Sequence, residues 1–202
     1  KESSAASDVY KRQDVEIITE NWLEEMLQLC QQKDVGMVGA KLYYPDDTIQ
    51  HAGVVVGLGG VAAHVLCKLP RDAEGYMGRL RCVQEISAVT AACMMVKTSV
   101  FKAVGGFDEE LKVAFNDIDL CMKVRKYGVK IVFTPYAELY HYESKSRGME
   151  DTPEKQLRFS REVNCFRRKW ERELLKGDPY YNPNLTLNNT DCSLRKQEKN
   201  GD

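Results

Sequence analysis

The chain has 202 residues, of which 43% are hydrophobic and 29% charged, a composition ordinary for one folded domain with a substantial core. The formal net charge is -1, so no overall electrostatic field favours nucleic acid or a membrane surface. No apolar run approaches the roughly 18 residues of a membrane-spanning helix. The seven cysteines form no Cys-x-x-Cys pair, which argues against a zinc site and favours a reducing, cytoplasmic setting.

The first thirteen residues, KESSAASDVYKRQ, lack apolar periodicity, and their last part resembles the translation of a sequencing-library adapter. We therefore expect residues 1–13 to be a non-native or disordered leader, with the native sequence starting near Asp14 and the gene truncated upstream. A native polar terminus is the alternative. The polar residues 188–202 are also expected to be disordered.

Strands and helices are predicted to alternate in the first half of the chain. DVEII, at 14–18, is typical of the end of a strand, and the apolar stripe from Trp22 to Cys30 predicts a helix. Apolar stretches at 35–44 and 48–60 predict two more strands, separated by a turn at 45–47. Residues 61–83 mix glycine, proline and charge without a period, which predicts a long functional or mobile excursion.

The second half continues this alternation. Residues 85–101 predict a strand and then a short helix, capped by Thr98 or Ser99. FNDIDLCMKVRKYG predicts a helix that ends at Gly128, and VKIVFTP predicts a strand that ends at Pro135. A long helix is predicted from the Thr152 cap to Gly177. The alternation indicates an α/β fold with a mixed sheet.

Asp117 and Asp119, within FNDIDLC, are the first candidates for chemistry. Residues two apart on a helix point about 200° apart, so these carboxylates cannot share one substrate atom. One can face a cleft while the other faces solvent or caps the helix. On local pattern alone Asp117 is more often an N-cap than a base, and Asn116 could be the cap instead.

His141 follows the strand predicted at 129–135. A lone histidine is more often packed or on the surface than a ligand, but flanking tyrosines and the polar loop beyond favour a site. His51 and His64 have weaker contexts, and both are interpreted as structural or substrate-near.

The order of several motifs resembles that of the family 2 glycosyltransferases with the GT-A fold, and bacterial rhamnosyltransferase-like enzymes of surface-polysaccharide synthesis in particular. These motifs are WLEEML, VGMVGAKLYYPDDTIQHAGVVVG, VGGFDEEL, NDIDLCMKVRKYGVKIVFTP, LYHYESKSRG and DPYYNPNL. The resemblance implies an N-terminally truncated GT-A fold with a mixed sheet, flanking helices and a long C-terminal helix. Residues 14–150 would form the acceptor- and metal-binding part, and residues 151–187 the C-terminal helix and extended tail.

The resemblance implies inverting transfer from a nucleotide-sugar donor to a glycan or lipid-linked acceptor, with Mn²⁺ or Mg²⁺ as cofactor. Asp117 falls where the family has its general base, and Asn116 replaces the acid that usually precedes it. Asp14 falls on the last aspartate of the family's Asp-x-Asp metal motif, whose first position is Arg12 here. His141 falls on a further metal ligand, and these oxygen and nitrogen donors suit either cation.

Four further residues are assigned to the donor by the same resemblance. Ser146 and Arg147 lie in a loop that could close over the diphosphate, and Gly105 and Gly106 would let the backbone approach the sugar. The nucleotide-recognising half is expected upstream. The chain as given is therefore expected to be catalytically inactive, with bare apolar surface on VGMVGA and ISAVTAACMMV.

Two rival interpretations stay open. A non-catalytic module could bind a glycan or protein through tyrosines that are otherwise half-buried packing, namely Tyr43, Tyr44, Tyr180 and Tyr181. The basic side of the 153–176 helix could contact the inner face of the cell membrane peripherally, although its glutamates favour a solvated helix. CFRRKW lacks the Gln-x-x-Arg-Trp pattern of processive membrane synthases.

Overall fold

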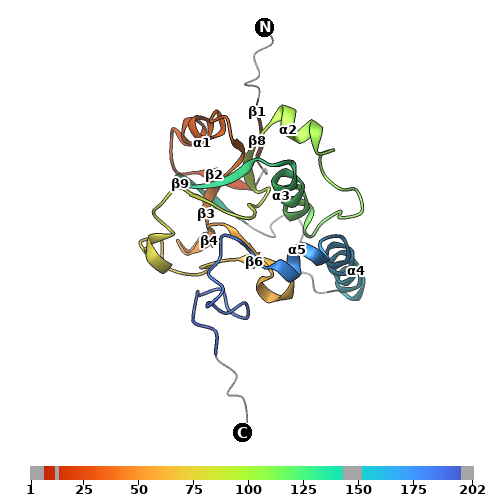
Figure 1. Cartoon of the computed structure of the whole chain (residues 1–202). Helices are drawn as coiled ribbons and strands as arrows, with labels where there is room; N and C mark the ends of the chain where they lie inside the picture. The colour runs from red at the N-terminus through yellow and green to blue at the C-terminus, as the bar shows by residue number, and fades with distance from the viewer. Residues whose placement is uncertain (1–6, 12–13, 143–151, 197–202) are drawn as a thin grey trace.

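A computed structural model describes residues 7–11, 14–142 and 152–196 of the chain (Figure 1). The elements in chain order are β1 (Ser7–Lys11), β2 (Val15–Ile17), α1 (Trp22–Cys30), β3 (Val35–Tyr43), β4 (Ile49–His51), β5 (Val54–Val56), η1 (Leu58–Gly60), β6 (Ala62–His64), η2 (Tyr76–Gly78), β7 (Gln84–Glu85), β8 (Cys93–Lys97), α2 (Thr98–Ala103), α3 (Asn116–Tyr127), β9 (Lys130–His141), α4 (Pro153–Lys169) and α5 (Glu171–Lys176). No helix in these ranges is both long and apolar enough to cross a bilayer.

A mixed sheet forms the centre of the molecule. Its strand order within the described ranges is β1-β8-β3-β9-β2, with β4 paired to β3 and β7 to β9. β3 and β9 run parallel, whereas the other pairs in this sheet are antiparallel. β5 and β6 form a separate hairpin. This architecture confirms the predicted α/β class, and it brings the ends of β2 and β9 together.

Helices cover both faces of the sheet. Helix α1 contacts β3, β8 and β9 on one face, while α2 and α3 lie on the other, with α4 and α5 on that same side (Figure 1). Successive residues of β3 point to opposite faces, so Met37 packs in one core and Val38 in the other. All of β3 is buried, as are Cys93–Val96 of β8. The expectation of bare apolar surface on VGMVGA and ISAVTAACMMV was therefore wrong, because helices of this chain cover both faces.

β9 does not end at Pro135, contrary to the sequence-based prediction. Gly39 of β3 pairs with Phe133, but Lys41 pairs with Glu138, so residues 134–137 of β9 form a bulge. Proline has no N–H to donate to a ladder, and a bulge removes that requirement. The strand therefore continues to His141 at the edge of the candidate site.

Helix ends follow the predicted chemistry in two cases. Thr152 Oγ1 accepts a hydrogen bond from the Lys155 N–H at 3.3 Å, and Gly128 ends α3 with a φ of 97°. The predicted cap of α2 is absent, since Lys97 occupies the N-cap position without a side-chain hydrogen bond. The long C-terminal helix is interrupted at Trp170, whose φ of -114° and ψ of 23° are not helical.

Both ends of the chain contain structure where disorder was expected. Residues 7–11 form β1, which pairs with β8. Near the other end, the Thr186 N–H donates to the Ser193 carbonyl at 2.8 Å, and Cys192 is buried. Residues 1–6, 12–13 and 197–202 lie outside the described ranges.

Candidate active site

A cavity of about 420 Å³ lies beside the N-terminal end of α3. Its polar lining comes from Tyr44, Gln50, His64, Thr90, Asp117 and His141. Much of the remaining lining is apolar, and it includes Phe115 before α3 and Phe159 of α4. The cavity therefore combines titratable groups with apolar and aromatic walls, as small-molecule sites commonly do.

Asp117 is the second residue of α3, and backbone amides hold its carboxylate. Oδ2 accepts a hydrogen bond from the Ala91 N–H at 3.0 Å, and Oδ1 accepts one from the Ile118 N–H at 2.9 Å. Neither Asp117 nor Asn116 is the N-cap residue, a position that belongs to Phe115. Asp117 nevertheless satisfies a first-turn amide while it lines the cavity, so the predicted roles of cap and base are not exclusive.

The loop before α3 is fixed by α4. Both carboxylate oxygens of the buried Glu162 accept backbone N–H bonds, from Val113 at 3.1 Å and from Ala114 at 3.0 Å. Phe115 has a φ of 62°, a strained value for a bulky residue. Its ring packs against Phe159 and Phe166 of α4, with centroid distances of 5.8 and 5.4 Å. These contacts hold the backbone that leads into Asp117.

Asp14 and His141 meet where β2 pairs with the end of β9. Asp14 Oδ1 lies 3.6 Å from His141 Nε2, and both side chains are largely buried. His141 Nδ1 lies 2.8 Å from Gln50 Oε1. The structure thus brings together the two residues predicted to bind a metal, and it places one of them in the cavity lined by Asp117.

The fit of a divalent cation to this pair can be tested on the donor atoms. Asp14 Oδ1 is buried and makes no hydrogen bond within the described part of the chain. Those residues supply no cluster of three or more His, Cys, Asp or Glu side chains suited to a metal. Two protein ligands still fit Mg²⁺ or Mn²⁺, because such ions often take their other ligands from substrate phosphates and water. The pair is therefore compatible with a substrate-completed cation site.

The other two histidines lie next to each other. His51 Nδ1 and His64 Nδ1 are 2.8 Å apart, and the rings meet edge to face at 4.9 Å. Burial of His51 lowers its pKa well below 6.5, and the nearby His64 and His141 add to this shift. His51 is thus neutral at pH 7, while His64 reaches the cavity, consistent with the interpretation of both as structural or substrate-near.

Asp119 is neither solvent-exposed nor a helix cap, so that prediction was wrong. Its carboxylate is fully buried and accepts a hydrogen bond from Trp170 Nε1 at 2.8 Å. Lys169 Nζ lies 2.8 Å from Oδ1, and Lys123 Nζ lies 3.1 Å from Oδ2. The charge is matched within the chain, and Asp119 joins α3 to the junction of α4 and α5.

The residues assigned to the donor are not gathered at the cavity. Gly105 and Gly106 form the left-handed turn after α2, with φ of 78° and 63°, and they are absent from the cavity lining. The Gly106 carbonyl accepts a hydrogen bond from Lys123 Nζ at 2.6 Å. Ser146 and Arg147 lie outside the described residues. A role for these four residues at the donor stays a prediction.

Two residues that hold the site were missed in the sequence. Gln50 lies in a fully buried strand, yet it follows the apolar Ile49 in the text TIQHAG. Gln50 and His51 are adjacent polar residues in a strand predicted to be apolar. This pair could have indicated a buried polar contact, because buried polar groups need hydrogen-bond partners. Glu162 sits in a helix rich in charge and gave no comparable signal.

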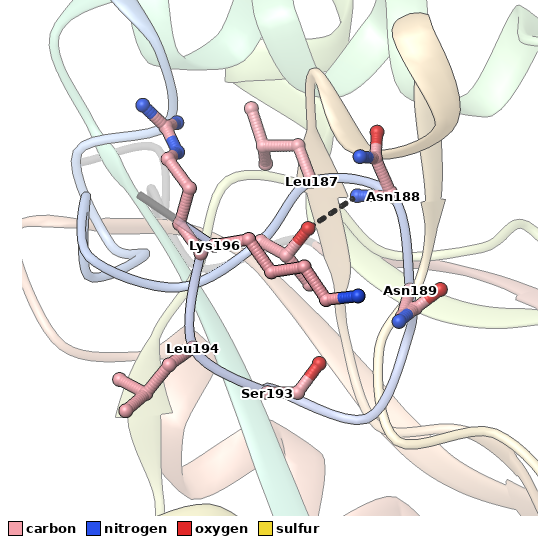
Figure 2. Close-up of a pocket in the computed structure, with 8 residues that line it drawn as sticks. Leu187, Asn188, Asn189, Ser193, Leu194 and Lys196 are labelled. Carbon is pink, nitrogen blue, oxygen red and sulfur yellow. Dashed lines mark hydrogen bonds between the residues drawn. The ribbon is translucent and has the colours of Figure 1, made fainter. Parts of the chain in front are cut away.

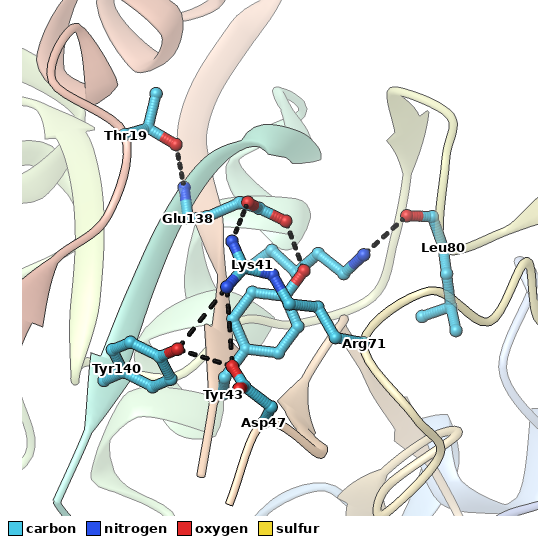
Figure 3. A network of polar contacts seen from close by, with 8 residues as sticks. All are labelled: Thr19, Lys41, Tyr43, Asp47, Arg71, Leu80, Glu138 and Tyr140. Atoms are coloured by element: carbon cyan, nitrogen blue, oxygen red, sulfur yellow. Dashed lines mark hydrogen bonds and ion pairs between the residues drawn. The ribbon is translucent and has the colours of Figure 1, made fainter. Parts of the chain in front are cut away.

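A second polar network fastens the 61–83 excursion to the sheet (Figure 3). Arg71 Nη2 lies 2.9 Å from Glu138 Oε2, and its guanidinium lies 4.9 Å from the centre of the Tyr43 ring. The Tyr43 hydroxyl donates to Glu138, and Lys41 Nζ donates to the Leu80 carbonyl at 3.0 Å. Burial lowers the pKa of Lys41. These contacts join the excursion to β3 and β9.

A larger hollow, of about 960 Å³, lies within the C-terminal loop at residues 186–196 (Figure 2). Leucine, asparagine, serine and basic side chains line it, and the Asn188 N–H donates to Thr186 Oγ1 at 3.1 Å. Among the described residues, its lining contains no acid or histidine. General-base chemistry is therefore assigned to the smaller cavity beside α3.

Comparison with known proteins points to one chemistry. Residues 1–162 match the family described as "Glycosyltransferase like family". The chain is 58% identical over 182 residues to protein y4gI of Sinorhizobium fredii and 37% identical over 203 residues to the O-antigen biosynthesis protein RfbC of Myxococcus xanthus. A segment of 62 residues is 36% identical to the N-acetylglucosaminyl-diphospho-decaprenol L-rhamnosyltransferase of Mycobacterium tuberculosis. These matches cover 90%, 100% and 31% of the chain, which spans 20%, 16% and 20% of the respective relatives.

Two solved structures share the fold. GalNAc-T7, crystallised with UDP, GalNAc and Mn²⁺, has a TM-score of 0.57 at 13% identity, over 84% of this chain and 32% of its own. The mannosyltransferase PcManGT of Pyrobaculum calidifontis, in complex with GDP-Man and Mn²⁺, has a TM-score of 0.50 at 15% identity, over 82% of this chain and 39% of its own. At such identities the likeness concerns the fold alone, which is the GT-A fold.

Proposed function

Because the chain belongs to the glycosyltransferase-like family, with a family 2-like domain of the GT-A fold, we propose that it transfers a sugar from a nucleotide-sugar donor to a glycan or lipid-linked acceptor, with inversion at the anomeric carbon. The names of the relatives in O-antigen biosynthesis and rhamnosyl transfer support a role in cell-surface polysaccharide synthesis. The seven free cysteines agree with a reducing cytoplasmic setting, which we propose together with peripheral contact at the inner membrane face.

The observation that carries this proposal is the shared cavity of Asp117 and His141. Asp117 offers a carboxylate at one wall, and His141 reaches Asp14 at another. The proposed general base and one of the two proposed cation ligands therefore border one space, and the second ligand lies 3.6 Å from the first. That is the combination a sugar transfer needs when a hydroxyl attacks and a diphosphate leaves.

In the proposed reaction, an acceptor hydroxyl oxygen attacks the anomeric carbon of the donor while the bond from that carbon to the phosphate oxygen breaks. Asp117 takes the hydroxyl proton, and the nucleoside diphosphate leaves with the bonding electron pair. Hydrogen bonds from the backbone amides of Ala91 and Ile118 hold the carboxylate at the cavity. A bound divalent cation would offset the negative charge that develops on the diphosphate.

Asp14 and His141 would hold that cation, and Glu162 would keep the loop before Asp117 in place. Phe115 and Phe159 supply apolar surface, on which the carbon face of a sugar ring can stack. His64 and Thr90 offer polar groups to sugar hydroxyls.

The test is release of nucleoside diphosphate by protein that carries this chain. UDP-, dTDP- and GDP-sugars are each supplied with Mn²⁺ and a lipid-linked glycan acceptor, and the leaving diphosphate is quantified. We expect acceptor-dependent release with one nucleotide class, and loss of release when EDTA removes the cation. Saturable glycan binding without release from any donor would instead support the non-catalytic module.

A further inference from the structure

Gln50 and His141 flank the end of β3. Tyr43, the last residue of β3, pairs with Ile49 of β4 and with Tyr140 of β9. The next residues along those two strands are Gln50 and His141, and both are buried, with relative exposures of 4% and 6%. Gln50 lies at the irregularity where β4 pairs with Leu42 and Tyr43, and its side chain reaches His141 from there.

Two hydrogen bonds join these residues. Gln50 Nε2 donates to the backbone carbonyl of His141 at 3.2 Å, and Gln50 Oε1 lies 2.8 Å from His141 Nδ1. A carbonyl oxygen can only accept, so the amide nitrogen must face it and the amide oxygen must face the ring. The second contact then requires a proton on Nδ1.

The position of that proton decides what the other ring nitrogen offers. In a neutral imidazole protonated at Nδ1, Nε2 carries a lone pair. This nitrogen lies 3.6 Å from Asp14 Oδ1, which is itself buried without a hydrogen bond in the described residues. A lone pair on Nε2 and a carboxylate oxygen are both donors that a divalent cation can accept.

We propose that Gln50 is a positioning residue that keeps His141 in the Nδ1–H tautomer and so presents Nε2, together with Asp14, to a divalent cation. This inference rests on the proposed function, which requires that cation. Partners that fix the tautomer of a histidine ligand typically change metal affinity by about 10- to 100-fold. Gln50 would act through His141 without touching the cation.

The first experiment measures binding of Mn²⁺ alone to the apo chain, by the electron paramagnetic resonance signal of the free ion. We expect Gln50→Leu to weaken Mn²⁺ binding by about 10- to 100-fold. Gln50→Glu should stay closer to the wild-type affinity, because its carboxylate still accepts the Nδ1–H bond. Gln28→Leu is the matched control, since Gln28 is exposed on α1 and should bind Mn²⁺ as the wild type does.

The second experiment reads the tautomer without any metal, from the ¹⁵N chemical shifts of His141 at neutral pH. The wild type should show a protonated Nδ1 and an unprotonated Nε2, and Gln50→Leu should show a mixture of tautomers. A wild-type ring protonated at Nε2 would overturn the proposal, even if Gln50→Leu failed to fold.

The outcomes also separate this inference from the function on which it rests. If the wild type binds no Mn²⁺, either alone or with a nucleoside diphosphate present, the cation of the proposed function fails and the inference fails with it. If the wild type binds Mn²⁺ and Gln50→Leu binds it equally well, only the role of Gln50 is lost.

Discussion

The carboxylates of Asp119 and Asp14 have contrasting surroundings, the first fully buried and the second 14% exposed. Asp119 is matched within the chain by Trp170, Lys123 and Lys169. Asp14 faces His141 at 3.6 Å, and no lysine or arginine among the described residues pairs with it. The sequence placed both acids near a candidate site, but only Asp119 has several charged and hydrogen-bonding partners in the described part of the chain.

The difference teaches how to separate a structural acid from a functional one. A buried charge is costly unless it is paired, so Asp119 with its partners stabilises the fold. Asp14 has one such neighbour, His141, and its Oδ1 accepts no hydrogen bond from the described residues. The comparison predicts that changes at Asp119 lower stability, whereas changes around the cavity lined by Asp117 and His141 lower ligand binding or turnover.

The largest effect is expected from Asp119→Ala. Removal of one partner from a buried ionic cluster typically costs about 3–5 kcal/mol, and this change would leave Trp170 Nε1 without its acceptor and take one partner from each of Lys123 and Lys169. Urea unfolding followed by circular dichroism measures the loss. Glu171→Ala, at an exposed position, is the control and should change the unfolding free energy by less than about 0.5 kcal/mol. A similarly small change for Asp119→Ala would remove the structural half of the comparison.

Asp117→Asn should show the reverse behaviour. We expect turnover to fall by about 10²-fold or more, because an amide cannot take the hydroxyl proton, while donor binding stays nearly intact. The unfolding free energy should change little, because the amide oxygen can still accept one backbone bond. Asp34→Asn is the control, since that side chain is 59% exposed and pairs with Lys130 on the surface. Near-normal turnover of Asp117→Asn would return Asp117 to a role in the helix start.

An intermediate effect is expected from His51, a buried base without a counter-charge. Its folded pKa lies well below 6.5, mainly because of burial. The unfolded chain therefore binds a proton near pH 6.5 that the folded chain rejects, so this stabilisation is fully present above that pH and is lost as pH falls towards the folded pKa. The slope for one proton is about 1.4 kcal/mol per pH unit.

Urea unfolding between pH 7.5 and 5.0, with EDTA present, measures this slope for the wild type and for His51→Leu. The variant should give a curve flatter by about one proton below pH 6.5. Parallel curves for the two proteins would show that His51 is charged in the folded state.

The smallest effect is expected from Arg71→Met. The Arg71 side chain is 37% exposed and Glu138 is 24% exposed, so solvent screens this pair, unlike the pair at Asp119. We expect a loss of at most about 1 kcal/mol, and it should shrink further in 1 M salt. Amide hydrogen exchange should quicken between residues 66 and 82 and stay unchanged in α3. A loss as large as that of Asp119→Ala would mean that exposure does not separate the two clusters.

The sequence predicted those features that depend on local chemistry. The Thr152 cap, the Gly128 end of α3 and the buried strand β3 each follow from a few adjacent residues. The extension of β9 past Pro135 was missed because it depends on a bulge against β3, nearly a hundred residues away. The residues around Pro135 alone do not show that β9 pairs with β3 through a bulge, so they predict that the strand ends there.

The candidate site was also only partly predictable from the sequence. The resemblance brought Asp14, Asp117 and His141 together, and the structure places Asp14 against His141 and His141 in the Asp117 cavity. Gln50 and the burial of Asp119 depend on partners 91 and 51 residues away, which no spacing rule contains. Helical geometry showed that Asp117 and Asp119 point in different directions, but it could not show which residues contact Asp119.

Glu162 in α4 and Trp170 at its C-terminal end act as two anchors, and they restrict which sequence changes this helix can tolerate during evolution. Glu162 holds the amides of Val113 and Ala114, and Trp170, just past the end of α4, holds Asp119. A helix turns by about 100° per residue, so one codon inserted between the two anchors would swing either Glu162 or Trp170 away from its partner. Many exposed positions between them can accept substitutions, but insertions and deletions there should be eliminated by selection.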